Sequence, residues 1–140
     1  YTPLLPMFTL GHQFKPSNIH AGGLRYHGAG MIVSQLIKDK MMHGVDIPQL
    51  ESFESGMLFA RTEGIIPAPE SCHAIAATIR EAKKCKETGE QKVILFCLSG
   101  HGLIDMPSYE QFISGDLQNY TVSDEEIERN VSELEPIIKE

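Results

Sequence analysis

A continuous apolar run between two glycines constrains this chain most. Residues 92–98 read Lys-Val-Ile-Leu-Phe-Cys-Leu, with Gly89 before them and Gly100 after them. A run of this length is typical of a strand that is buried on both faces, as strands are inside a parallel sheet. Stretches with apolar residues at helical spacing occur before and after this run. The predicted class is therefore α/β, with a parallel sheet.

Apolar residues recur at three- and four-residue steps in three other stretches, and each series ends at a glycine. The stretches run from Met31 to Gly44, from Leu50 to Gly64 and from Ile75 to Gly89. An amphipathic series with a terminal glycine predicts a helix that packs on one face. Further helices are predicted over 109–113 and 123–138, the latter with a capping box formed by Ser123 and Glu126.

These elements divide the chain into three predicted parts. Residues 1–28 are rich in Gly, Pro and His without a sustained period, which indicates a loop-rich opening segment. Residues 29–122 hold the predicted α/β core, and residues 123–140 form an acidic C-terminal helix. Because the chain starts at Tyr1 rather than at a methionine, we expect a truncated or cleaved product.

Composition argues against several classes of protein. Hydrophobic residues make up 41% and charged residues 22%, and no apolar run approaches the roughly 18 residues that span a bilayer. The net charge is −7 with scattered cations, so neither nucleic acid nor a membrane is an expected partner. Three cysteines without CxxC spacing indicate reduced thiols and a cytoplasmic location. Six histidines without an HExxH pattern do not predict a metal site.

The loop after the predicted strand is the best-placed location for chemistry. Ligands of open α/β sheets bind beyond the carboxyl ends of the strands, where Ser99-Gly100-His101-Gly102 lies. The glycines let backbone approach a flat ligand, and the Ser99 hydroxyl can donate to a ring nitrogen. A tight turn before the next helix explains the same residues equally well.

Two further segments are candidates. The pair Glu70-Ser71 follows the proline-stiffened stretch 64–69 at the start of a predicted helix, where partial positive charge favours a carboxylate. A helix cap is the simpler interpretation of this position taken alone. Residues 20–30 are glycine-rich and precede a helix, an arrangement that often holds anions, but they have no Walker pattern.

Two alternatives to a cofactor site remain open at this point. Ser-Gly-His-Gly after an apolar strand resembles the catalytic histidine motif of caspase-like and metacaspase-like cysteine peptidases. Those enzymes place a nucleophilic cysteine after a later strand, whereas no cysteine follows His101 and Cys97 would lie inside the buried strand. The other alternative is a non-catalytic α/β assembly module that self-associates through an exposed apolar face.

Three segments together resemble the tryptophan synthase beta chain family in order and spacing. They are 22–28 (Gly-Gly-Leu-Arg-Tyr-His-Gly), 63–74 (Glu-Gly-Ile-Ile-Pro-Ala-Pro-Glu-Ser-Cys-His-Ala) and 98–102 (Leu-Ser-Gly-His-Gly). The resemblance covers residues 8 to 115 and is to the beta-like second branch, because Arg25 stands where the main branch has an acidic residue. It implies the C-terminal portion of a three-layer, fold-type-II enzyme that uses pyridoxal 5'-phosphate and joins L-serine and indole to give L-tryptophan.

The resemblance also implies roles for single residues. Ser99 resembles the serine that hydrogen-bonds the pyridine nitrogen, Glu70 resembles the glutamate beside the ring, and Gly100 belongs to the same cofactor-binding loop. Arg25 is implied on the substrate side, where serine and an activated serine both remain candidate substrates. A monovalent cation, K⁺ or Na⁺, would be held in part by the backbone carbonyls of Leu24, Tyr26 and Gly28.

The family's catalytic lysine and its phosphate-binding loop have no recognisable counterpart in this sequence. No catalytic residue is therefore predicted here, and the chain alone is expected to be inactive. The implied partners are the remaining N-terminal part of the same enzyme, a second copy in a homodimer, and small-molecule substrates. The tryptophan synthase alpha chain is a further candidate partner, which the departure at Arg25 leaves open.

Overall fold

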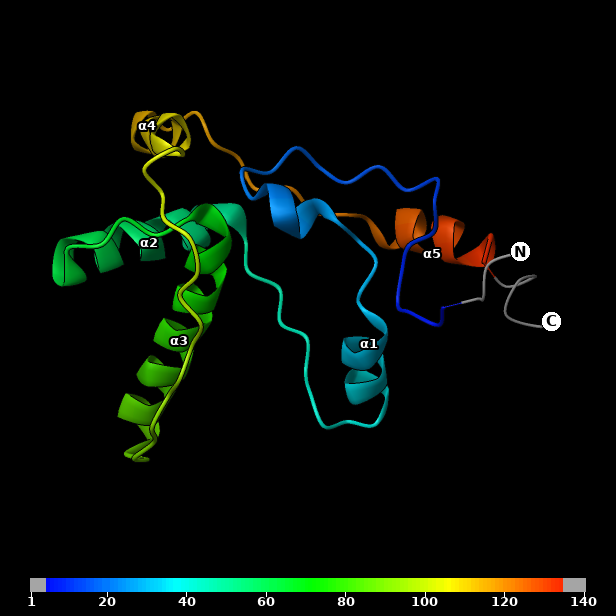
Figure 1. Ribbon diagram of the computed structural model, residues 1–140, viewed down its shortest axis with the longest axis horizontal. Helices are drawn as coiled ribbons and strands as arrows, with labels where there is room; N and C mark the ends of the chain where they lie inside the picture. Colours follow the sequence, from blue (N-terminus) through cyan, green and yellow to red (C-terminus); the bar gives the residue numbers. More distant parts are fainter. Residues whose placement is uncertain (1–4, 135–140) are drawn as a thin grey trace. The chain divides into compact units, whose positions relative to one another are not determined.

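The computed structural model describes residues 5–134, and Figure 1 shows helices joined by long connecting segments. In chain order the helices are the 3-10 helix η1 (Gly22–Arg25), α1 (Met31–Lys38), α2 (Gln49–Glu63), α3 (Pro69–Thr88), α4 (Met106–Ser114) and α5 (Asp124–Ser132). The chain forms two compact units. The central unit contains residues 19–22 and 45–120, and the terminal unit contains the described residues of 5–18, 23–44 and 121–134.

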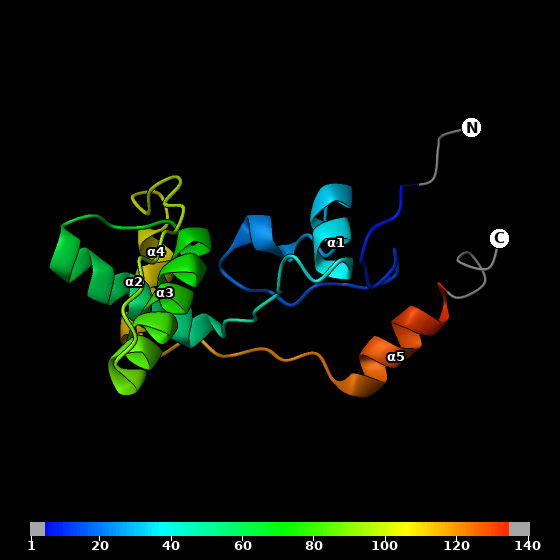
Figure 2. The ribbon, with the colours of Figure 1, turned by 90° about the horizontal axis from the view of Figure 1, so that it is seen from below.

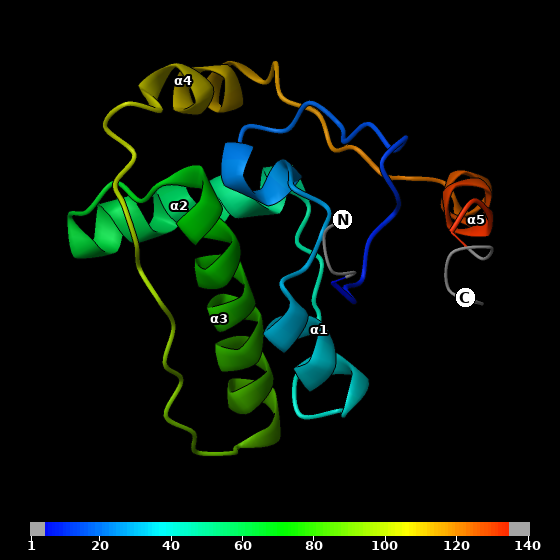
Figure 3. The same ribbon diagram turned by 45° about the vertical axis from the view of Figure 1, so that its right-hand side comes forward.

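The core of the central unit lies where α2 packs against α3 and α4 (Figure 3). Its buried residues are Phe53, Cys72, Tyr109 and Leu117, with Leu50, Met57, Ile66 and Phe112 packed around them. The Phe53 ring meets Tyr109 edge to face, with 5.1 Å between ring centroids, and stacks on Phe112 at 5.7 Å. Such aromatic pairs add to the stabilisation from burial, so they hold α4 on α2.

A glycine on α2 allows α3 and α4 to approach closely. A Cβ at Gly56 would overlap the Cys72 sulfur and lie 3.0 Å from the Tyr109 hydroxyl oxygen. Since a packed interior leaves few voids for a displaced side chain, any larger residue here would push the three helices apart. The position of the Cys72–Tyr109 pair therefore depends on the absence of a side chain at residue 56.

The glycine stops predicted for the second and third helices are confirmed. Gly64 and Gly89 both adopt the left-handed conformation, each with φ of 72°, directly after α2 and α3. At the other end of α3, Pro69 occupies the first turn, where a missing N–H costs nothing. At the start of α5, Ser123 caps the helix, because the Glu126 N–H donates to its hydroxyl at 3.2 Å, which is one half of the predicted capping box.

The first and last helices differ in length from the prediction. α1 ends at Lys38 rather than near Gly44, because Lys40 has φ of 59° and the N–H of Met41 turns back to the Leu36 carbonyl at 2.9 Å. This closing turn satisfies a carbonyl at the helix end before Gly44 is reached. α5 ends at Ser132 within the described residues, and the continuation predicted toward Ile138 lies in residues 135–140, outside them.

The apolar run 92–98 does not form the predicted strand in this structure, and residues 5–134 contain no strand at all. The segment instead returns along α3 toward its start (Figures 2 and 3), with Lys92 bonded to Glu81 at 2.9 Å. Val93 is fully exposed and Leu95 is 94% exposed. A strand needs a neighbouring strand to accept and donate its backbone hydrogen bonds, and the described residues supply none.

In the terminal unit, α1 is tied to the opening segment by Ser34. The Phe8 N–H donates to the Ser34 hydroxyl at 3.0 Å, and this hydroxyl donates to the Ala29 carbonyl at 3.1 Å. The Ala29 N–H in turn donates to the Phe8 carbonyl at 3.0 Å. A buried serine thus organises residues that carry no periodic pattern. None of the helices described is both long and apolar enough to cross a membrane.

Candidate functional site

The proline-stiffened stretch 64–69 and the Ser-Gly-His-Gly loop meet in the central unit. The Gly102 N–H donates to the Ile66 carbonyl at 2.9 Å. The Ser71 hydroxyl donates to the Ser99 carbonyl at 2.7 Å and accepts from the Ser99 N–H at 3.2 Å. These bonds join residues 28 or more positions apart, so two of the three motif segments form one local structure.

Gly102 makes this contact sterically feasible. A Cβ at this residue would overlap the Pro67 carbonyl oxygen and lie 2.8 Å from Cγ2 of Ile66. Gly100, by contrast, has φ of 67° with its nearest neighbour, the Ala68 Cβ, 3.6 Å from where its own Cβ would be. Gly102 is therefore required by packing, and Gly100 by its backbone conformation.

Buried hydrogen bonds connect the proline stretch to α4 and α3. The Tyr109 hydroxyl donates to the Pro67 carbonyl at 2.6 Å, and the Cys72 sulfur lies 3.3 Å from the same hydroxyl oxygen. Burial raises the pKa of Tyr109 and also raises the pKa of the Cys72 thiol, because neither anion would be solvated there. Cys72 is thus a protonated structural thiol rather than an activated nucleophile.

The residues predicted to bind the cofactor all belong to the central unit. Glu70 lies half-buried in the first turn of α3, next to Ser71. Ser99 and Gly100 are exposed in the loop that Ser71 holds. The structure therefore places the predicted hydroxyl and carboxylate on two segments that are bonded to each other. This arrangement leaves an exposed hydroxyl on a backbone that is held in place.

The residues predicted for the substrate and the cation belong to the terminal unit. Arg25 ends η1, and its Nε atom is buried with no hydrogen-bond partner among the described residues. Leu24 and Tyr26 are exposed, and a Cβ at Gly28 would lie 3.0 Å from the Met7 sulfur. No cluster of three histidine, cysteine or acidic side chains suited to a metal ion occurs in residues 5–134.

The histidine and cysteine of the peptidase alternative have no catalytic arrangement here. His101 is exposed, and its Nδ1 accepts from the Leu103 N–H at 3.3 Å, which closes a local turn. Cys97 is exposed on the extended segment, and Cys72 is buried against Tyr109. Because a Cys–His pair needs the thiol within hydrogen-bond reach of the ring, the described contacts give no support to such chemistry.

Sequence reasoning singled out Glu70-Ser71 as a candidate pair but did not identify the partner of Ser71. A helix cap was the simpler interpretation of this pair, but the cap position itself is taken by Ala68. The partner of Ser71 lies 28 residues away, which no local pattern reveals. The available signal was that each of the two motif segments carries a serine, Ser71 in 63–74 and Ser99 in 98–102.

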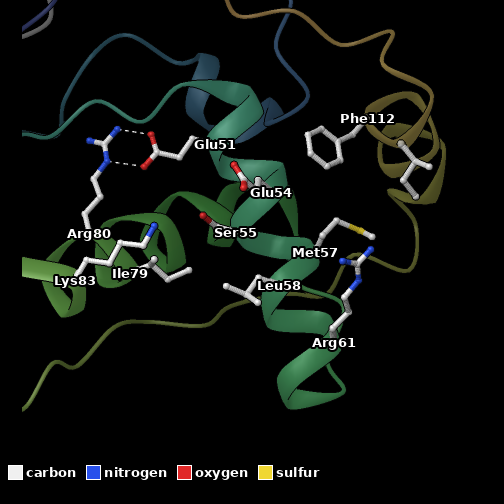
Figure 4. A pocket seen from close by; sticks show the side chains of 11 residues that line it. Glu51, Glu54, Ser55, Met57, Leu58, Arg61, Ile79, Arg80, Lys83 and Phe112 are labelled. Carbon is white, nitrogen blue, oxygen red and sulfur yellow. Dashed lines mark hydrogen bonds and ion pairs between the residues drawn. The ribbon is translucent and has the colours of Figure 1, made fainter. Parts of the chain in front are cut away.

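A hollow of about 500 Å³ lies elsewhere in the central unit, between α2, α3 and α4 (Figure 4). On one side of it, Arg80 of α3 pairs with both carboxylate oxygens of Glu51 of α2, with Nε 2.6 Å from Oε1. The Arg80 guanidinium holds the pKa of the Glu51 carboxyl below its usual range. Neither Ser99 nor Glu70 lines this hollow, so it is separate from the joined motif segments.

Comparisons with known proteins bear on these segments. The chain matches no family model. It is 59% identical over 116 residues to the tryptophan synthase beta chain 2 of Aquifex aeolicus, a match that covers 83% of this chain and 27% of that protein. The chain belongs to the tryptophan synthase beta chain family. The resemblance identified from three motifs is thereby confirmed, and the peptidase and assembly-module alternatives are not favoured.

Other members of the tryptophan synthase beta chain family give the same coverage. The beta chain 2 of Thermotoga maritima is 57% identical over 108 residues, which are 77% of this chain and 26% of that protein. The beta chain of Thermococcus onnurineus is 53% identical over 119 residues, covering 85% and 27%. The chain thus spans about a quarter of the length of these relatives. Two of the three are named beta chain 2, in agreement with the second branch indicated by Arg25.

Proposed function

We propose that this chain supplies the residues beside the pyridine nitrogen of a pyridoxal 5'-phosphate site in a tryptophan synthase beta-like enzyme. The whole enzyme would join L-serine and indole by β-replacement to give L-tryptophan. One observation carries the proposal: Ser71 and Gly102 fasten the Ser99 loop to the segment that bears Glu70. The hydroxyl and the carboxylate expected beside the cofactor are therefore held by one bonded structure.

The residues present fit the ring end of this cofactor. Ser99 offers an exposed hydroxyl for the pyridine nitrogen, and Gly100 adds no side chain beside it. Glu70 is a half-buried carboxylate next to Ser71, the residue that holds the Ser99 backbone. The bound cofactor supplies an electron sink. A neutral hydroxyl leaves the ring nitrogen largely unprotonated, which moderates that sink and favours elimination and replacement at the β carbon. An aspartate at residue 99 would do the opposite.

We extend the proposal to the sheet. Residues 92–98 would become a buried strand of a three-layer, fold-type-II core when the rest of the enzyme provides neighbouring strands. The nearly complete exposure of Val93 and Leu95 supports this, because apolar side chains on an unpaired extended segment favour burial. Ser99 would then lie at the carboxyl end of a strand, where such folds bind ligands.

The remaining assignments concern residues of the terminal unit. The carbonyls of Leu24, Tyr26 and Gly28 would hold a monovalent cation, K⁺ or Na⁺, and Arg25 would face the amino-acid substrate. The buried Arg25 Nε without a partner supports a role for this guanidinium toward an acidic group. Expected partners are the N-terminal part of the same enzyme, a second copy in a homodimer and the tryptophan synthase alpha chain, all in the cytoplasm.

Trapping the cofactor with borohydride tests the proposed function. The full-length enzyme should yield one reduced lysine adduct per chain, at a lysine that is not among these 140 residues. The isolated 140-residue chain should yield no stoichiometric adduct, because the Schiff-base lysine has no counterpart in it. Peptide mapping by mass spectrometry locates the modified lysine in each case. A near 1:1 adduct on the isolated chain, or none on the full-length protein, would contradict the proposal.

A further inference from the structure

We propose that Ser71 is a positioning residue that fixes Ser99 against the ring nitrogen of the cofactor. The inference rests on the proposed function and adds a residue to it. Ser71 itself touches neither cofactor nor substrate in this account. Its role is to hold the backbone from which the Ser99 hydroxyl projects.

The Ser71 hydroxyl engages both backbone polar groups of Ser99. It donates its single proton to the Ser99 carbonyl at 2.7 Å and accepts from the Ser99 N–H at 3.2 Å. Two bonds from one oxygen to the two sides of one residue restrict rotation about φ and ψ of that residue. The Ser99 side chain takes no part in either bond, so its hydroxyl remains available to a ligand.

Burial strengthens these two hydrogen bonds between Ser71 and Ser99, which together form a clamp. Ser71 is 5% exposed, whereas Ser99 is exposed. Hydrogen bonds shielded from water are stronger than exposed ones, and leaving their groups unpaired is costly. The clamp therefore extends the order of α3 into an exposed loop that lacks, among the described residues, any strand neighbour to hold it.

Local helix chemistry does not explain where this hydroxyl points. A serine in a first turn often bonds to its own helix backbone, but the Ser71 hydroxyl bonds to a loop 28 residues away. The same loop is held a second time three residues later, where the Gly102 N–H meets the Ile66 carbonyl at 2.9 Å. Ser99 and Gly100 thus lie between two anchor points on the proline-bearing segment.

The test uses the full-length enzyme with Ser71→Ala and a matched control, Ser55→Ala. Ser55 is a serine of similar burial on α2, 6% exposed, and it makes no contact in the clamp. We expect Ser71→Ala to weaken cofactor binding about three- to tenfold, the scale of one lost hydrogen bond, with Ser55→Ala unchanged. With cofactor labelled at the ring nitrogen, the ¹⁵N resonance should move toward its position in Ser99→Ala only in the Ser71 variant.

A double-mutant cycle separates positioning from a general structural effect. If Ser71 acts through Ser99, then Ser71→Ala should add almost nothing to the weakened cofactor binding of Ser99→Ala. Full additivity, or a Ser71 variant that matches Ser55→Ala in both affinity and resonance, overturns the inference. If Ser99→Ala itself changes neither, the proposed function fails, and the two failures are thereby distinguished.

Discussion

At the scale of single residues, Gly102 decides whether the two motif segments can meet. Any side chain here would overlap the Pro67 carbonyl and press on Ile66. Because the obstacle is backbone rather than a flexible side chain, the loop cannot relax around it without losing the Gly102–Ile66 hydrogen bond. The site therefore depends on a residue with no functional group.

We expect Gly102→Ala to lower the free energy of unfolding by about 1–3 kcal/mol, the usual cost of overpacking. Gly44→Ala is the matched control, since a Cβ at Gly44 meets nothing within 4 Å and should change stability by less than about 0.5 kcal/mol. Urea denaturation of both variants measures the difference. Equal midpoints for the two variants would show that the close approach to Pro67 is not required.

The sequence identified Ser99-Gly100-His101-Gly102 as a ligand loop, but it could not assign the separate tasks of its members. Gly100 needs a left-handed backbone, whereas Gly102 needs room beside Pro67. Only the second requirement involves a segment distant in the chain, and contacts of that kind leave no local pattern. Ser71 belonged to the candidate pair Glu70-Ser71, but its partner could not be predicted for the same reason, because that partner is 28 residues away.

At the scale of helices, Tyr109 of α4 links the proline stretch to the α2–α3 core. Its hydroxyl donates to the Pro67 carbonyl at 2.6 Å, and its ring packs on Phe53. Tyr109→Phe keeps the ring but leaves this buried carbonyl without its donor. We expect a loss of about 1–2 kcal/mol at pH 7, against little change for Tyr120→Phe, whose side chain is half exposed.

The same variant should alter the pH dependence of stability. Burial raises the pKa of Tyr109 in the folded chain, so the folded form binds this proton more tightly than the unfolded form. The stabilisation is complete below the unfolded pKa of about 10 and is lost as the pH rises beyond it. Tyr109→Phe should therefore lose less stability above pH 10 than the wild type does. Thermal unfolding from pH 7 to 11 measures this, and parallel curves for both proteins would contradict it.

Helix boundaries were predicted well where a glycine ends the helix. Gly64 and Gly89 could be identified from sequence because a left-handed C-terminal residue is a local requirement. Gly44 was a wrong stop for α1, since the turn at Lys40 ends that helix first. A lysine with φ of 59° has no distinctive sequence signal, so this boundary could not have been predicted from composition or period.

At the scale of the whole molecule, the apolar run 92–98 is where the sequence prediction and the described conformation differ most. The chain spans about a quarter of its relatives, and this run lies exposed without a strand neighbour among residues 5–134. The sequence pattern predicted a buried strand because a continuous apolar run favours burial on both faces. Under the proposed function, the rest of the enzyme would supply the neighbouring strands that bury this run, which would account for the difference between the prediction and the described conformation.

The central claim is that the rest of the enzyme completes this core around the Ser99 loop, and alkylation of Cys97 tests it most directly. Cys97 is exposed on the unpaired run, whereas Cys72 is buried and serves as an internal control. Peptide mass spectrometry after iodoacetamide treatment reports each thiol separately. We expect Cys97 to react quickly in the 140-residue chain and on the order of tenfold or more slowly in the full-length enzyme, where it would react only during local opening. Equally fast modification of Cys97 in both proteins would contradict the account.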